Sequence, residues 1–211
     1  MVLRYRTLNL ESQGIYKDKG SKFEAYAFPV ENLEQVQIRL DQLRQTHYKA
    51  RHHCYAYAIG ADAKDFRAFD DGEPRHCAGD SILGQIRSFD LTNVLIVVVR
   101  YFGGTKLGIG GLVHAYREAA KQALETGNIV EKEPSQSWVL TFDYPDMNGV
   151  MHLVKELKLK VLWQHFEERC KMILKVPISK LDLADDRLKQ IPGVKLEMRN
   201  EKLSGDTKIL T

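Results

Sequence analysis

The sequence predicts an α+β protein with two domains, and three observations support this fold class. Strand-like and helix-like segments alternate from about residue 22 to residue 126. The segment Glu131-Lys132-Glu133-Pro134-Ser135-Gln136-Ser137 is polar and contains a proline, which is typical of a domain boundary. Beyond it, segments follow in the order strand, helix, strand, strand, helix, strand. We therefore expect one domain at residues 1–132 and a second at residues 137–211.

The composition is that of an ordinary globular protein. Of the 211 residues, 44% are hydrophobic and 28% are charged, which excludes disordered and collagen-like classes. The formal net charge is only +3, so nucleic-acid binding would need a local basic patch. The N-terminus carries no apolar signal segment, and the longest apolar run, residues 94–99, is too short to cross a bilayer. Three cysteines without C-x-x-C spacing favour a reducing compartment. We expect a cytoplasmic protein that does not bind membranes.

The first strand and helix are predicted from the spacing of apolar residues. Along residues 22–28, apolar or aromatic side chains occur on both faces, which predicts a strand covered on both sides. A helix follows up to about Thr46, because apolar residues recur at intervals of three and four, at Leu33, Val36, Leu40 and Leu43. Asn32, with Gln35 three residues later, is typical of a helix N-terminal cap.

A hairpin is predicted next, since a short connection separates strand-like residues 54–59 from strand-like residues 66–69. The segment Asp71-Gly72-Glu73-Pro74 then has strong turn chemistry. We expect Asp80 or Ser81 to cap a short helix that turns its apolar side chains inward, at Ile82, Leu83 and Ile86.

A central strand then leads into a glycine-rich loop and a helix. Residues 93–101 are apolar on both faces, which predicts a strand at the centre of the sheet. Five of the 15 glycines fall between Gly103 and Gly111, where they permit positive φ angles or a close approach to the backbone. A helix with a wide apolar face follows from Leu112 and is expected to end near Gly127. The first amides of such a helix are free to bind an anion.

Basic residues surround this junction. Arg100 and Lys106 flank the glycines, and the spacing of His114, Arg117 and Lys121 aligns them on one face of the helix. We predict that these residues form one solvent-facing surface that binds phosphate groups, together with Arg51, Gly103 and Gly104. The alternative is that the glycines serve only a tight turn and close packing. The loop matches neither G-x-x-x-x-G-K-[ST] nor G-x-G-x-x-G.

Histidines and cysteines form a second candidate site. His52 and Cys54 share one face of a predicted strand, and His76 and Cys77 follow the turn. These residue types are common zinc ligands, but their spacing matches no recognised zinc motif. The alternative is buried cysteines and hydrogen-bonded histidines. We expect no metal and no other cofactor, and no triad of nucleophilic catalysis can be identified.

The acidic turn is a third candidate. Asp70, Asp71 and Glu73 could bind a divalent cation or act as general acid and base. Turns also favour aspartate for backbone reasons alone. A third interpretation is that the turn pairs with Arg51 or Arg100 and fixes the shape of the neighbouring site.

The second domain is predicted to have a ferredoxin-like fold. Strands are expected at residues 138–142, 161–166, 170–176 and 194–198, with helices at about 145–157 and 179–190. The resulting βαββαβ order is that of the split βαβ pattern.

Four motifs follow one another along the first domain. They are Lys19-Gly20-Ser21-Lys22-Phe23, Ala50-Arg51-His52-His53-Cys54-Tyr55-Ala56-Tyr57, Asp70-Asp71-Gly72-Glu73-Pro74, and the strand and glycine loop of residues 93–113. Together they resemble the IMPACT family, in its bacterial YigZ-like branch. From about Trp138 onward the chain is similar to the second domain of that branch.

The resemblance implies a fold for each domain. The N-terminal domain would be related to domain IV of elongation factor G and to the second domain of a small-subunit ribosomal protein. The C-terminal ferredoxin-like domain would be similar to domain V of elongation factor G. Both relatives touch ribosomal RNA. Eukaryotic members restrain an initiation-factor kinase by competing for its ribosome-associated activator, but they carry an additional N-terminal domain, so that role is not expected here.

One loop departs from the family pattern. The family continues Glu-Pro with Ser-Gly-Thr-Ala-Gly, whereas Glu73-Pro74 is followed here by Arg75-His76-Cys77-Ala78-Gly79. Bulkier side chains replace small polar residues and a glycine, so we expect an altered loop geometry, and Arg75 adds positive charge.

These observations favour a nucleic-acid-binding protein whose partner is structured RNA or the ribosome, with a translational or regulatory role and no catalytic chemistry. Two alternatives stay open. One is an enzyme that uses Asp71, Glu73, His52 and His53, with or without a metal, on a small phosphorylated or peptide substrate. The other is a regulator that binds a translation-factor protein.

Overall fold

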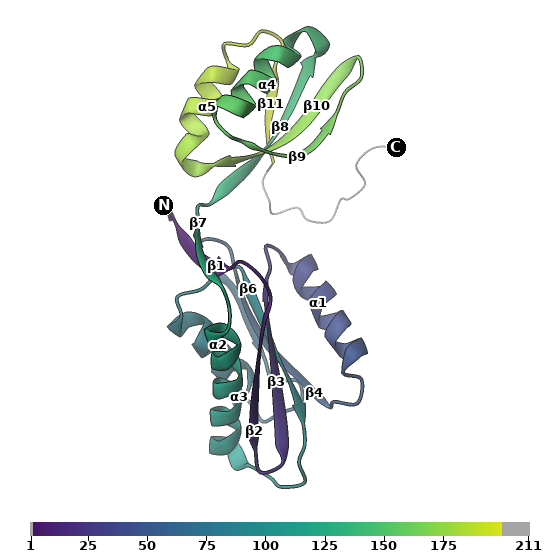
Figure 1. Cartoon of the computed structure of the whole chain (residues 1–211), viewed down its shortest axis with the longest axis vertical. Coiled ribbons are helices and arrows are strands. Elements are labelled where there is room, and N and C mark those ends of the chain that lie inside the picture. The colour runs from purple at the N-terminus through teal and green to yellow at the C-terminus, as the bar shows by residue number, and fades with distance from the viewer. Residues whose placement is uncertain (1, 200–211) are drawn as a thin grey trace. The chain divides into compact units, whose positions relative to one another are not determined.

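The computed structural model describes residues 2–199, which form two compact units, residues 2–132 and 133–199 (Figure 1). The first unit is built on a five-stranded antiparallel sheet in the order β2-β3-β6-β4-β5. Its strands are β2 (Ser12–Asp18), β3 (Ser21–Pro29), β4 (His52–Ile59), β5 (Asp65–Phe69) and β6 (Val94–Tyr101). The central position of β6 was predicted from its two apolar faces and is confirmed.

Helices cover both faces of this sheet (Figure 1). Helix α1 (Leu33–Thr46) packs on one face, and helices α2 (Gly79–Ser88) and α3 (Gly108–Glu125) pack on the other. Alternate side chains of β3 enter the two cores, since Phe23, Ala25 and Ala27 face α2 and α3 while Phe28 faces α1. The prediction of a strand covered on both sides is therefore confirmed.

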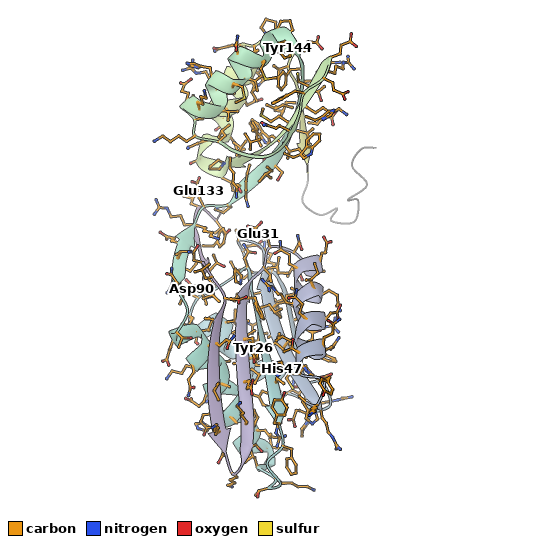
Figure 2. The ribbon with its side chains drawn as sticks, turned by 45° about the vertical axis from the view of Figure 1, so that its right-hand side comes forward. Tyr26, Glu31, His47, Asp90, Glu133 and Tyr144 are labelled. Carbon is orange, nitrogen blue, oxygen red and sulfur yellow. The ribbon has the colours of Figure 1, made fainter. Side chains whose placement is uncertain are left out.

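Helix α1 begins and ends with side-chain contacts. The N–H of Gln35 donates to Oδ1 of Asn32 at 2.9 Å, which confirms the predicted cap. At the other end, His47 lies against the sheet beside Tyr26, with the two ring centroids 5.3 Å apart (Figure 2). Nδ1 of His47 also shares a hydrogen bond of 2.9 Å with the hydroxyl of Tyr101.

Three strands of this unit were not predicted. Strand β1 (Tyr5–Leu8) pairs antiparallel with β7 (Ile129–Lys132), and this pairing of distant segments leaves no local signal. Strand β2 is largely polar because it lies at an edge of the sheet. Its Gly14 lies so close to α3 that an added Cβ would collide with the helix backbone at Ala123.

The second unit has the predicted βαββαβ order. Strands β8 (Ser135–Asp143), β9 (Lys160–His165), β10 (Arg169–Pro177) and β11 (Lys195–Arg199) form an antiparallel sheet in the order β11-β8-β10-β9. Helices α4 (Met147–Glu156) and α5 (Leu181–Leu188) contribute to a core that includes Trp138, Leu140, Phe142 and Met172. Within residues 2–199, no helix combines the length and the apolar character needed to span a bilayer.

Candidate nucleic-acid interface

The glycine-rich loop joins β6 to α3, and part of its glycine content is required by the fold. A Cβ on Gly103 would collide with the backbone of Gly20 and Ser21 in the turn between β2 and β3. Gly104 and Gly108 adopt φ angles of +88° and +72°, in the left-handed region that favours glycine. Close packing therefore explains the glycine at position 103, and the turn geometry explains those at positions 104 and 108.

The amino end of α3 is different, because nothing in the fold requires glycine at position 110. An added Cβ there would meet no atom within 4 Å, and the φ angle of Gly110 lies outside the left-handed region. Leu107 precedes the helix and makes no side-chain hydrogen bond to its first turn. The first amides of α3 have no intrahelical acceptor, so this helix end is open to an approaching anion.

Arg100 does not lie on a solvent-facing surface, and this corrects its predicted role. Its side chain is only 8% exposed, and Nη1 donates to Oε1 of Glu73 at 2.6 Å. The guanidinium also lies 5.4 Å from the ring centroid of Phe23 and 5.6 Å from that of Phe102. Sequence reasoning counted Arg100 as a free cation, but Glu73 neutralises it. Its Nε atom is buried without a hydrogen-bond partner.

Buried hydrogen bonds connect this ion pair to the core of the unit. The hydroxyl of Tyr116 donates to the same Glu73 oxygen at 2.8 Å, and Sγ of Cys54 donates to that hydroxyl at 3.3 Å. Burial raises the pKa of the Tyr116 hydroxyl and of the Cys54 thiol well above their usual ranges. Both groups therefore stay protonated at neutral pH, and the Tyr116 hydroxyl donates directly to Glu73 and helps to hold it in place.

The acidic turn that supplies Glu73 is held by its own backbone. Asp71 and Gly72 have φ angles of +41° and +84°, and the N–H of Glu73 donates to the Asp70 carbonyl at 2.9 Å. Positive φ at both central residues is the geometry of a type I′ turn. Oδ2 of Asp71 accepts the backbone N–H of His53 at 2.7 Å.

Asp70 caps helix α2, which corrects the predicted cap. Its carboxylate accepts the backbone N–H groups of His76, Ala78 and Gly79, each at 2.9 Å. Neither Asp80 nor Ser81 occupies the cap position, because the helix begins earlier, at Gly79. The predicted pairing of the acidic turn with Arg100 is confirmed, while Arg51 lies exposed. The turn is thus a structural support for the neighbouring loop.

The histidine and cysteine candidates have other partners. Nδ1 of His52 lies 2.8 Å from the Asp71 carbonyl oxygen, and Nδ1 of His76 lies 2.6 Å from Oδ2 of Asp80. Cys54 and Cys77 are buried in the core beneath α2 and α3. Among residues 2–199, no group of three or more His, Cys, Asp or Glu side chains is arranged to hold a metal ion.

The predicted cations divide into separate groups. Lys106 is exposed at the amino end of α3. Arg117 is exposed and lines a groove between α2 and α3 that it shares with His76. His114 stands edge-on to Tyr16 of β2, at 5.6 Å between ring centroids. Lys121 pairs with Glu125 at 3.5 Å, near the other end of the helix. The prediction of one continuous surface that includes Arg100 is therefore wrong, but Lys106, His114 and Arg117 remain exposed along α3.

The atypical loop after Pro74 is accommodated by the fold. His76 takes a φ angle of +65°, Cys77 turns into the core, and Arg75 stays exposed. The N–H of Cys77 donates to the Pro74 carbonyl at 3.2 Å. The bulkier residues therefore change the surface beside α2 without removing the cap that Asp70 provides.

A hollow of about 370 Å³, which we call the Arg100 hollow, opens at the amino end of α3. Its lining consists of Glu73, Pro74, Arg100, Phe102, Lys106, Leu107, Gly108, Ile109 and Leu112. Sequence reasoning missed its apolar members. Phe102 gave a usable signal, since an aromatic residue at the end of a core strand, directly before two glycines, has no further sheet to pack against.

Comparison with known proteins agrees with the four sequence motifs. The model of the Impact N-terminal domain matches residues 19–124. An IMPACT family member of Haemophilus influenzae is 35% identical over 158 residues, 74% of this chain and 77% of that protein. The IMPACT family member YigZ of Escherichia coli is 31% identical over 165 residues, 77% of this chain and 81% of that protein. A crystal structure of a hypothetical protein is similar over 96% of this chain and 100% of that chain, with a TM-score of 0.75 and 26% identity. The chain belongs to the IMPACT family.

Proposed function

We propose that the N-terminal unit binds RNA, through phosphate groups that contact the amino end of α3, in a translational or regulatory role. The observation that carries this proposal is the convergence of exposed Lys106 with the uncapped first turn of α3, where Gly110 leaves the backbone open. A helix amino end and a lysine both favour a negatively charged oxygen. The proposal also rests on the family resemblance, since the fold relatives that it implies touch ribosomal RNA.

Two further side chains extend this surface along α3. Arg117 carries a positive charge and His114 can donate a ring N–H, and both lie on exposed turns of the same helix, so a second phosphate of one RNA strand can contact them. Asp71 and Glu73 are engaged by His53 and Arg100, which gives the alternative of a carboxylate-dependent enzyme no support. Arg100 supports the RNA surface by shaping the loop, not by adding free charge.

Charge reversal tests the proposal. We expect Lys106→Glu and Arg117→Glu each to weaken binding of a fluorescein-labelled RNA hairpin about tenfold, which corresponds to ~1.4 kcal/mol, measured by fluorescence anisotropy. Lys64→Glu is the matched control, because exposed Lys64 lies in the turn between β4 and β5, at the end of the sheet where β6 begins and opposite to the glycine loop. Equal affinity of all three variants and the wild type would contradict the proposed interface.

A further inference from the structure

The Arg100 hollow is shaped for a small group with an apolar body. Its volume of about 370 Å³ lies within the range of roughly 300–1,000 Å³ that is typical of small-molecule sites. Apolar side chains form most of the wall, at Pro74, Phe102, Leu107, Ile109 and Leu112. Two of them are strongly exposed, with 59% of Phe102 and 66% of Ile109 accessible to solvent.

The charges that line the hollow favour a neutral ligand group in its inner part and an anionic ligand group in its outer part. Deep in the hollow, Glu73 already neutralises Arg100, so a second anion there would meet the Glu73 carboxylate. A neutral group with an apolar or aromatic surface fits there without repulsion.

The outer part of the hollow favours an anion. Lys106 and Gly108 line it, and Gly108 is the first residue of α3. The positive end of the helix dipole and the lysine charge therefore act at the same place. A ligand that fits both parts has a neutral, flat or apolar body joined to a negatively charged group.

We infer that the Arg100 hollow holds one unpaired nucleotide of the bound RNA. The base packs on the exposed ring of Phe102, while its phosphate contacts Lys106 and the first amides of α3. A base in a duplex is stacked between its neighbours and does not reach the hollow. This inference rests on the proposed RNA-binding function, and it specifies that the bound RNA is single-stranded or contains a loop.

The test compares two labelled probes at one salt concentration by fluorescence anisotropy. One is a single-stranded RNA of twelve nucleotides, and the other is a blunt duplex of the same sequence. Because a base that stacks on the Phe102 ring loses this contact when the ring is removed, we expect Phe102→Ala to weaken single-strand binding about tenfold and duplex binding less than twofold. Phe102→Trp should keep the single-strand affinity, and Phe102→Leu should lose it, since leucine fills space without stacking.

Phe66→Ala is the matched control, because Phe66 is 50% exposed on β5 and also has an arginine over its ring, Arg87 at 4.7 Å. Full affinity of Phe102→Ala or Phe102→Leu for the single strand would overturn the inference. So would a wild-type protein that does not prefer the single strand. In either case a retained loss in Lys106→Glu would leave the proposed function standing, whereas no loss in either Lys106→Glu or Arg117→Glu would overturn the function itself.

Discussion

The acidic turn and the glycine loop lie side by side in the first unit, yet they differ in how many of their polar groups have hydrogen-bond partners within the protein. In the turn, carboxylates accept hydrogen bonds from backbone amides, and Glu73 receives both Arg100 and Tyr116. In the loop, the first turn of α3 has no side-chain cap, and Gly110 faces open space. The difference indicates that the turn builds the site and that the loop is the part available to a ligand.

The largest effect is expected from a substitution that breaks the buried ion pair between Glu73 and Arg100. Glu73→Gln leaves the Arg100 charge buried without its counter-charge, so we expect a loss of about 3–5 kcal/mol in the free energy of unfolding, measured by urea denaturation. Glu125→Gln is the matched control, because the Lys121–Glu125 pair is 45% and 51% exposed and such pairs contribute about 0–1 kcal/mol. Similar losses in the two variants would refute the structural role of Glu73.

A second pair of variants separates the two kinds of glycine in the loop. Gly103→Ala should cost about 3 kcal/mol of stability, because its Cβ collides with the neighbouring turn. Gly110→Ala should leave stability unchanged or raise it by up to about 1 kcal/mol, since alanine favours a helix. If the open backbone admits phosphate, Gly110→Ala nevertheless weakens RNA binding. Unchanged RNA affinity would mean that position 110 is not a point of close approach.

The cap of α2 gives a smaller effect. Asp70→Ala removes the acceptor of three backbone N–H groups, and we expect a loss of about 2 kcal/mol in the free energy of unfolding. Asp80→Ala should cost less than about 0.5 kcal/mol, because Asp80 is exposed and pairs only with exposed His76. The reverse order of the two losses would contradict the assignment of the cap to Asp70.

The smallest expected effect is a pH dependence at His53, beside the turn. Burial lowers the pKa of His53 below its ordinary value of 6.5, and this outweighs the opposite influence of Asp71. The unfolded chain therefore binds a proton at higher pH than the folded chain does. The contribution of neutral His53 to the free energy of unfolding is fully present above pH 6.5 and is lost as the pH drops toward the folded-state pKa. We expect His53→Gln to flatten this decline below pH 6.5, in a series of urea denaturation experiments. An unchanged slope would exclude His53 as its source.

The fold could be predicted largely because local signals were strong. Apolar spacing fixed α1, α3 and the central strand, and the order of segments identified the second unit. Strands β1 and β7 were not predicted, since each is short and its partner is distant in the chain. The cap of α2 was misassigned for a similar reason, because Asp70 acts from the preceding turn and not from the helix itself.

The contacts within the candidate site could be predicted only in part. The glycine cluster and Lys106 indicated the helix end at which we propose the interface, and the pairing of Glu73 with Arg100 was among the interpretations considered. Sequence spacing alone cannot tell a buried, neutralised arginine from an exposed one, so Arg100 was counted as available charge. The apolar wall of the Arg100 hollow was also missed, because its residues come from both sides of the glycine loop.

The salt dependence of RNA binding tests the central claim most directly, since each phosphate contact contributes about 0.7–0.9 to the slope of log affinity against log salt concentration. We expect a steep decline for the wild type and a slope smaller by about one contact in Lys106→Glu, with Lys64→Glu parallel to the wild type. A wild-type affinity that does not change with salt, or identical slopes in Lys106→Glu and the wild type, would contradict phosphate binding at the amino end of α3.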